Sequence, residues 1–236
     1  LAAVPPGLRE AAGDPYAARA AVLALMIQAG GDPQASRAWA LIEARDPALA
    51  RTLRRLAPAC LATGDSGRLP LLDLCLPALR DLSPRQREDF LTLVDEVVAA
   101  DGTTTPAEFI FAAVLRHHLL QAAGVAAGAA IWSLSPLRHE VQVLFSALAH
   151  AGADDDADRA RAAFAAGISR LGRQVEVGLL PTDACGPAAL GPACERLGRA
   201  ALALRRRTVH AAAWCVASDG RIATAELELL RLVGDL

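Results

Sequence analysis

The sequence predicts an all-α protein of roughly ten helices, and three observations predict it. Hydrophobic residues make up 53% of the 236 residues, whereas aromatic residues make up only 4%. The apolar residues are mostly alanine and leucine, which form helices readily, while the β-branched and aromatic residues that favour strands are sparse. Apolar residues also recur at helical spacing, and several of these runs follow an Asp-Pro or Ser-Pro pair, a common helix start.

The N-terminal part shows three such starts. Asp14-Pro15, Asp32-Pro33 and Asp46-Pro47 each place a capping carboxylate before a proline at the first helical position. The run TGDSG, Thr63–Gly67, predicts a loop, because glycine, serine and aspartate favour turns. The following apolar segment is expected to form a short helix or one kinked at Pro77, since proline removes a helix hydrogen bond.

The remaining elements follow the same logic. Ser83-Pro84 predicts a long helix that ends near Ala100, and residues 135–152 predict another. Asp154–Asp156 are expected to cap the next helix at the positive end of its dipole, with metal binding by this cluster as the weaker alternative. Residues 173–192 are the most loop-like, because the strand-like run QVEVGLL has no second strand to pair with.

One short pattern occurs twice. The stretch VVAADGTTTPAEF (97–109) reappears as CVASDGRIATAEL (215–227), and Asp219 follows Asp101 by 219 − 101 = 118 residues. Both stretches end an apolar run in Asp-Gly and then open a new apolar run. They predict two helix–turn–helix units related by internal duplication.

The chemistry of the turn is specific. Gly102 and Gly220 are predicted to adopt the left-handed conformation that ends a helix. Thr105 and Glu108 have the spacing of a capping box around proline. The second copy has Ala223 in place of the threonine, so its cap is expected to be weaker or shifted.

Four acids of the hairpins are the candidate site residues: Asp101, Glu108, Asp219 and Glu226. Negative charge at a helix C-terminus is unfavourable, so the aspartates need a compensating partner. We favour hydrogen bonds from loop N–H groups to the carboxylates. The alternative is a divalent cation site formed by the four acids, although the additional oxygen ligands of an EF-hand loop are missing.

The D-G-x₅-E hairpin resembles the TerB-like domain of tellurite-resistance and related proteins, some of which are thought to bind metal through such acids. Three longer stretches are similar to the C-terminal region of bacterial zinc-dependent membrane metallopeptidases with chaperone function, relatives of HtpX and the CAAX prenyl proteases. They are VPPGLREAAGDPYAARAAVLALMI, RLPLLDLCLPALRDLSPRQREDFLTLVDEVVAADG and VASDGRIATAELELLRLVGDL. The second stretch, Arg68 to Gly102, is the most distinctive.

The resemblance implies a non-catalytic regulatory or protein-interaction domain of such a peptidase. The implied partners are the protease domain or other proteins, on the cytoplasmic side of the bacterial inner membrane. Zinc is then expected only in the protease domain. The nearest string to HExxH is His139–Val143, which has Val143 where the second zinc-binding histidine is required. A stand-alone cation-binding TerB-like domain and a helical-repeat adaptor remain as alternatives.

The resemblance also implies three segments. Residues 1–66 form an N-terminal helical segment, 67–124 the first TerB-like unit, and 125–236 the second unit with its preceding helices. Because the sequence starts at Leu1 instead of a methionine, we expect a piece of a longer protein.

The composition excludes several classes of function. A net charge of −2 gives no general basic field for nucleic acid. No apolar stretch reaches the roughly 20 residues of a membrane span. The five cysteines lack CxxC spacing and are expected to be buried thiols, and Trp39, Trp132 and Trp214 are expected in the core or between helices. No nucleophile elbow or phosphate loop is present, so we expect no catalytic residues and no cofactor in this chain. Because it has no apolar stretch of membrane-spanning length, we also expect it to be soluble.

Overall fold

The structure, a computed structural model, describes residues 4–29, 37–100, 102, 104–121, 130–172 and 175–235. Within these ranges it contains twelve α-helices, three short 3₁₀ helices and no strand. A single parallel bridge joins Ile131 to Ala200. The predicted all-α class is confirmed, with two more helices than the sequence indicated.

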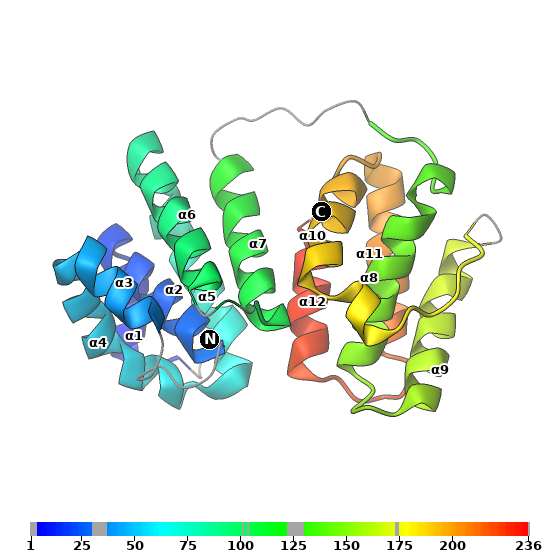
Figure 1. The fold of residues 1–236 in the computed structure, drawn as a ribbon, viewed down its shortest axis with the longest axis horizontal. Coiled ribbons are helices and arrows are strands. Elements are labelled where there is room, and N and C mark those ends of the chain that lie inside the picture. Colours follow the sequence, from blue (N-terminus) through cyan, green and yellow to red (C-terminus); the bar gives the residue numbers. More distant parts are fainter. Residues whose placement is uncertain are drawn as a thin grey trace. The chain divides into compact units, whose positions relative to one another are not determined.

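The chain divides into two compact units, Leu1–Val125 and Ala126–Leu236 (Figure 1). The division into three segments that the resemblance implied stays a prediction. Unit 1 contains α1 (Pro6–Ala12), α2 (Pro15–Ala29), α3 (Arg37–Arg45), α4 (Pro47–Ala62), α5 (Gly64–Arg80), α6 (Pro84–Ala99) and α7 (Pro106–Gln121). Unit 2 contains η1 (Ser135–Leu137), α8 (Arg138–Ala151), α9 (Ala157–Ile168), η2 (Ser169–Leu171), η3 (Thr182–Cys185), α10 (Pro187–Gly198), α11 (Leu202–Val216) and α12 (Thr224–Gly234).

Each unit is built around one central helix. In unit 1, α2 packs against α5, α6 and α7, and α6 also contacts α3 and α7. In unit 2, α8 packs in the same way against α10, α11 and α12, and α11 also contacts α9 and α12. The two central helices are apolar and buried along most of their length, because each is covered on several sides.

One difference between the units lies in the segment that follows α3 in unit 1 and α9 in unit 2. In unit 1, α4 follows α3 and forms the most extensive packing on α2. In unit 2, the chain between η2 and η3 runs extended over residues 175–181. The loop-like prediction for residues 173–192 is confirmed over 175–181. It is wrong further along, where η3 occupies Thr182–Cys185 and α10 begins at Pro187.

The described helix starts form as predicted. Asp14 Oδ1 accepts from the N–H of Ala17 at 2.7 Å, and Asp46 Oδ1 accepts from the N–H of Leu49 at 2.9 Å. Ser83 forms a capping box at the start of α6. The predicted start at Asp32-Pro33 lies outside the described residues.

Two further local predictions differ from the structure. The expected loop at Thr63–Gly67 is instead the start of α5, where Gly64 has a φ of +61°. The next segment is also not a short helix, because α5 continues through Pro77 to Arg80. Its apolar face, including Leu71 and Leu79, is fully buried, and this tertiary packing outweighs the local effect of proline.

The tryptophan prediction fails for Trp132, which is 81% exposed. It follows Ile131, the residue that bonds to the segment before α11. Trp214 is 44% exposed and stacks against the guanidinium of Arg170 at 3.7 Å from the ring centroid.

Candidate functional site

The two predicted hairpins turn through the same backbone geometry. Gly102 has a φ of +73° and Gly220 a φ of +72°, so both use the left-handed region that glycine tolerates. The N–H of Gly102 donates to the carbonyl of Ala99 at 3.1 Å. The N–H of Gly220 donates to the carbonyl of Ala217 at 3.3 Å, at the position that the offset of 118 residues predicts.

The N-termini of α7 and α12 show the predicted difference. Thr105 and Glu108 form a reciprocal capping box, in which Thr105 N–H donates to Glu108 at 2.9 Å and Glu108 N–H donates to Thr105 Oγ1 at 3.2 Å. In the second hairpin, Ala223 N–H donates to Glu226 at 2.8 Å. Ala223 has no side-chain oxygen, so only half of the box forms.

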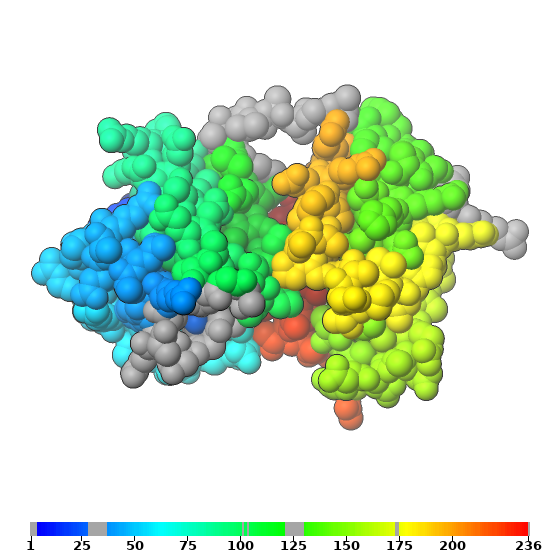
Figure 2. Space-filling model, viewed as in Figure 1, coloured from blue at the N-terminus to red at the C-terminus, as the bar shows by residue number. Residues whose placement is uncertain are grey.

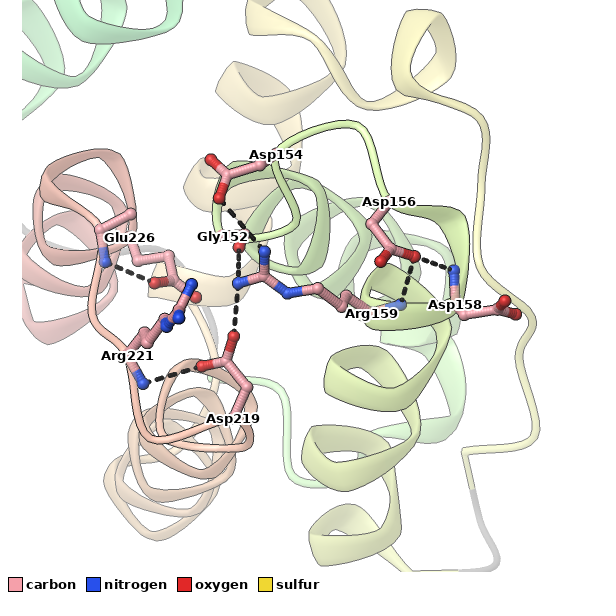
Figure 3. Close-up of polar contacts among 9 residues, drawn as sticks. Gly152, Asp154, Asp156, Asp158, Arg159, Asp219, Arg221 and Glu226 are labelled. Atoms are coloured by element: carbon pink, nitrogen blue, oxygen red, sulfur yellow. Dashed lines mark hydrogen bonds and ion pairs between the residues drawn. The ribbon is translucent and has the colours of Figure 1, made fainter.

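Around the second hairpin, a cluster of polar residues forms an arrangement that we call the clasp: Gly152, Asp154, Arg159, Asp219 and Glu226. Figure 3 shows the Arg159 guanidinium at its centre, between two loops. Arg159 donates to Asp154 Oδ2 at 3.1 Å and to the carbonyl of Gly152 at 3.0 Å. It also donates to Asp219 Oδ2 at 2.6 Å. The arginine on α9 therefore joins the α8–α9 loop to the α11–α12 turn.

Asp219 has a second role within its own turn. Its Oδ1 accepts from the N–H of Arg221 at 2.9 Å, the bond of an Asx-turn (Figure 3). These two interactions provide the compensation that an aspartate after a helix C-terminus requires. The hydrogen bonds from Arg159 and Arg221 hold the pKa of the Asp219 carboxyl below its usual value.

The loop that contains Asp154 has an unusual backbone. Asp154 and Asp155 both have positive φ, at 48° and 64°. Aspartate tolerates this region better than most residues, but the conformation still costs free energy. Asp156, as predicted, caps α9 by accepting from the N–H groups of Asp158 and Arg159. The strained turn directs Asp154 toward Arg159.

Glu226 is the buried acid of the clasp, with 4% of its surface exposed. It packs directly on Gly152, where an added Cβ would lie 2.9 Å from Oε2 and closer still to Oε1. Burial raises the pKa of the Glu226 carboxyl, and the nearby Asp219 adds to the rise. Glycine at position 152 is thus required by the close approach of this side chain.

The four predicted site residues lie as follows. Asp101 lies outside the described residues. Glu108 is in unit 1, is 5% exposed and forms the cap of α7. Asp219 and Glu226 come together in the clasp of unit 2. Within the described ranges, no group of three or more histidines, cysteines or acids has the arrangement of a metal site.

Sequence reasoning missed Arg159. It lies 60 residues from Asp219 in the chain, and no local pattern indicates that the two side chains meet. The only signal was the unpaired charge of an aspartate after a helix C-terminus, which required a partner without identifying it.

The string nearest to HExxH belongs to α8. Glu140 is 5% exposed, and its Oε1 pairs with Arg196 at 2.8 Å. Val143 is 1% exposed and lies in the core of unit 2. The string therefore serves the packing of α8 and its link to α10.

All five cysteines are buried and free, as expected for core thiols. Burial raises the pKa of Cys60, Cys75, Cys194 and Cys215 to about 12, so these thiols stay protonated and unreactive at neutral pH.

Within the described ranges, every helix is too short or too polar to cross a bilayer. Comparisons with protein-family models, curated proteins and solved structures found no significant match to the chain.

Proposed function

We propose that this chain is a non-catalytic regulatory or protein-interaction domain of a membrane-anchored zinc metallopeptidase. The proposal takes its parent protein from the resemblance of three sequence stretches to that family. It includes two TerB-like units derived from an internal duplication. Two observations support the duplication: the matching turns at Gly102 and Gly220, and the packing of α2 on α5, α6 and α7, which corresponds to that of α8 on α10, α11 and α12.

The observation that supports an interaction role is the contrast between the acids and the apolar residues of the second hairpin. Its described acids, Asp219 and Glu226, bond to its own backbone and to Arg159. Its apolar residues are exposed instead: Ile222 by 58% and Leu227 by 45%. These two residues occupy the positions that flank a helix N-cap as a hydrophobic staple, so they present one apolar patch to a partner.

The coding sequence upstream of Leu1 tests the parent protein. An HExxH motif and membrane spans there support the proposal, and their absence removes the peptidase and leaves the helical-repeat adaptor. The chain alone is expected to cleave no peptide. Cleavage that a chelator blocks would contradict a non-catalytic role.

The interaction itself is tested by co-purification with the upstream protease domain. Exchanging both Ile222 and Leu227 for serine is expected to reduce the bound fraction about tenfold, as for interface anchors worth more than 1 kcal/mol. Leu61→Ser is the matched control, because Leu61 is equally exposed at 58% but lies on α4 of unit 1. Equal loss in both variants would contradict a patch on the second hairpin.

Cation binding is the weaker alternative. In its favour, burial raises the pKa of Glu226 and the carboxylates of Asp219 and Asp154 add to the rise, so the three acids interact electrostatically. Against it, Arg159 already pairs with both aspartates. Calorimetry with calcium, magnesium, zinc and manganese decides: heat that disappears when Asp101 and Asp219 are both changed to alanine supports a site, and no heat removes it.

A further inference from the structure

The extended segment 175–181, which we call the strap, is bound along α8 by side chains that recognise its main chain. Gln142 donates from Nε2 to the carbonyl of Gly178 at 2.8 Å. The N–H of Leu180 donates to Ser146 Oγ at 2.9 Å, and its carbonyl accepts from His150 Nε2 at 2.8 Å. Gln142, Ser146 and His150 are spaced by four residues, so they form one polar row along the helix.

This row is arranged for an extended chain. Ser146 is fully buried, and both main-chain groups of Leu180 are satisfied by side chains of α8. A helix laid on the same surface would have its own N–H and C=O groups bonded internally, and it would leave the polar row without partners. In unit 1 the element at this point in the order is the helix α4, and it packs on α2 through apolar residues such as Leu49 and Leu53.

The strap has few buried side chains. Only Val175 is fully buried, while Val177, Leu179 and Leu180 are partly exposed and Gly178 is exposed. Figure 2 shows the strap, in yellow, at the surface of unit 2. The helix α4, in contrast, buries five residues: Leu49, Ala50, Leu53, Leu56 and Cys60. The strap therefore holds its place with much less buried apolar surface than its counterpart.

We propose that the α8 row of Gln142, Ser146 and His150 is a binding site for an extended apolar peptide of a protein partner, and that the strap is its built-in competitor. The inference gives the proposed interaction role a surface and rests on that role. The partner segment has a residue equivalent to Leu180, whose N–H and C=O are free to bond to Ser146 and His150. Two positions earlier it has a free carbonyl equivalent to that of Gly178. Leucine-like side chains occupy the positions equivalent to Leu179 and Leu180. Binding in trans replaces the strap bond for bond.

The test uses a fluorescent peptide with the sequence VEVGLLPT, residues 175–182, and the 236-residue chain. A variant with Val175, Leu179 and Leu180 all changed to serine weakens the strap and leaves α8 unchanged. The peptide is expected to bind this variant about tenfold more tightly than the unmodified chain, because the competitor occupies the site less often. Ser146→Ala in the same variant is expected to weaken binding about fivefold through loss of one hydrogen bond.

Two controls make the test specific. Ser169→Ala, an exposed serine at the end of α9, is expected to leave binding unchanged. The peptide VEVGLPPT lacks the N–H that Ser146 accepts, so it is expected to bind about fivefold more weakly. Equal binding of the two peptides, or no binding to the strap-weakened variant, would overturn the proposal.

A second measurement does not depend on the folding of the triple variant. In the unmodified chain, saturating VEVGLLPT peptide is expected to speed amide exchange across the strap, because the displaced segment loses its bonds to α8. Unchanged exchange in the strap would overturn the proposal. All of these experiments use the chain alone, so their failure is separate from the absence of a protease upstream of Leu1.

Discussion

The first hairpin, α6–α7, and the second, α11–α12, turn through equivalent backbone hydrogen bonds but stabilise the turn with different side chains. In the first, Thr105 completes a capping box with Glu108. In the second, the side chain of Ala223 cannot accept a hydrogen bond, and Arg159 from α9 binds the turn through Asp219. The first hairpin is thus stabilised by a capping box within four residues, and the second by an ion pair with a residue far away in the sequence. Two turns can therefore share one backbone shape although one is stabilised within the turn and the other by a residue elsewhere in its unit.

The largest expected effect tests the external support of the second hairpin. Gly152→Ala places a methyl group against the buried Glu226 carboxylate and is expected to lower the free energy of unfolding by about 2–3 kcal/mol. Gly198→Ala is the control, because a Cβ there meets nothing within 4 Å. Chemical denaturation measures both. Equal stability of the two variants would show that Glu226 moves aside freely.

The next effect tests the backbone that the hairpins share. Gly102→Ala and Gly220→Ala are each expected to cost about 1 kcal/mol, because both impose a side chain on a left-handed residue. Similar losses in denaturation experiments support equivalent turns. A loss at only one position would break the comparison between the hairpins.

Exchanging the N-cap residues of α7 and α12 tests the difference between the two hairpins. Thr105→Ala is expected to destabilise unit 1 by about 1 kcal/mol, and Ala223→Thr to stabilise unit 2 by a smaller amount of about 0.5 kcal/mol. Thermal unfolding of each variant measures the shift. If Ala223→Thr brings no gain, the N-terminus of α12 is already fully satisfied by other contacts.

The smallest effect is the pH dependence of the clasp. Asp219 has a pKa below its ordinary value of 3.8 in the folded chain, so its stabilisation is present above 3.8 and is lost as the pH falls through the folded pKa. Glu226 has a pKa above its ordinary value of 4.5, so its stabilisation is complete below 4.5 and is lost as the pH rises through the folded pKa.

Denaturation between about pH 3 and about pH 7 separates the two groups. Relative to the unmodified chain, Asp219→Asn is expected to flatten the acid side of the stability profile, and Glu226→Gln to flatten the decline at higher pH. Added salt is expected to weaken the Asp219 contribution, since its pair with Arg159 is partly exposed. The same response from both variants would contradict opposite pKa shifts.

Sequence reasoning predicted what a few neighbouring residues decide. The caps at Asp14, Asp46 and Ser83, the left-handed glycines and the incomplete box at Ala223 all depend on contacts within about four residues. For the same reason, the all-α class followed from composition and spacing. These features can be predicted from the sequence because the groups that interact are close together in it.

The sequence by itself therefore determined the all-α class, the helix starts at Asp14, Asp46 and Ser83, and the conformation of the two turns. Only the tertiary structure decided that α5 continues through Pro77, that Arg159 meets Asp219, that Trp132 faces solvent and that the strap lies on α8. Each of these depends on surfaces brought together by packing. The free energy gained there outweighs local preferences, and no short stretch of sequence encodes it.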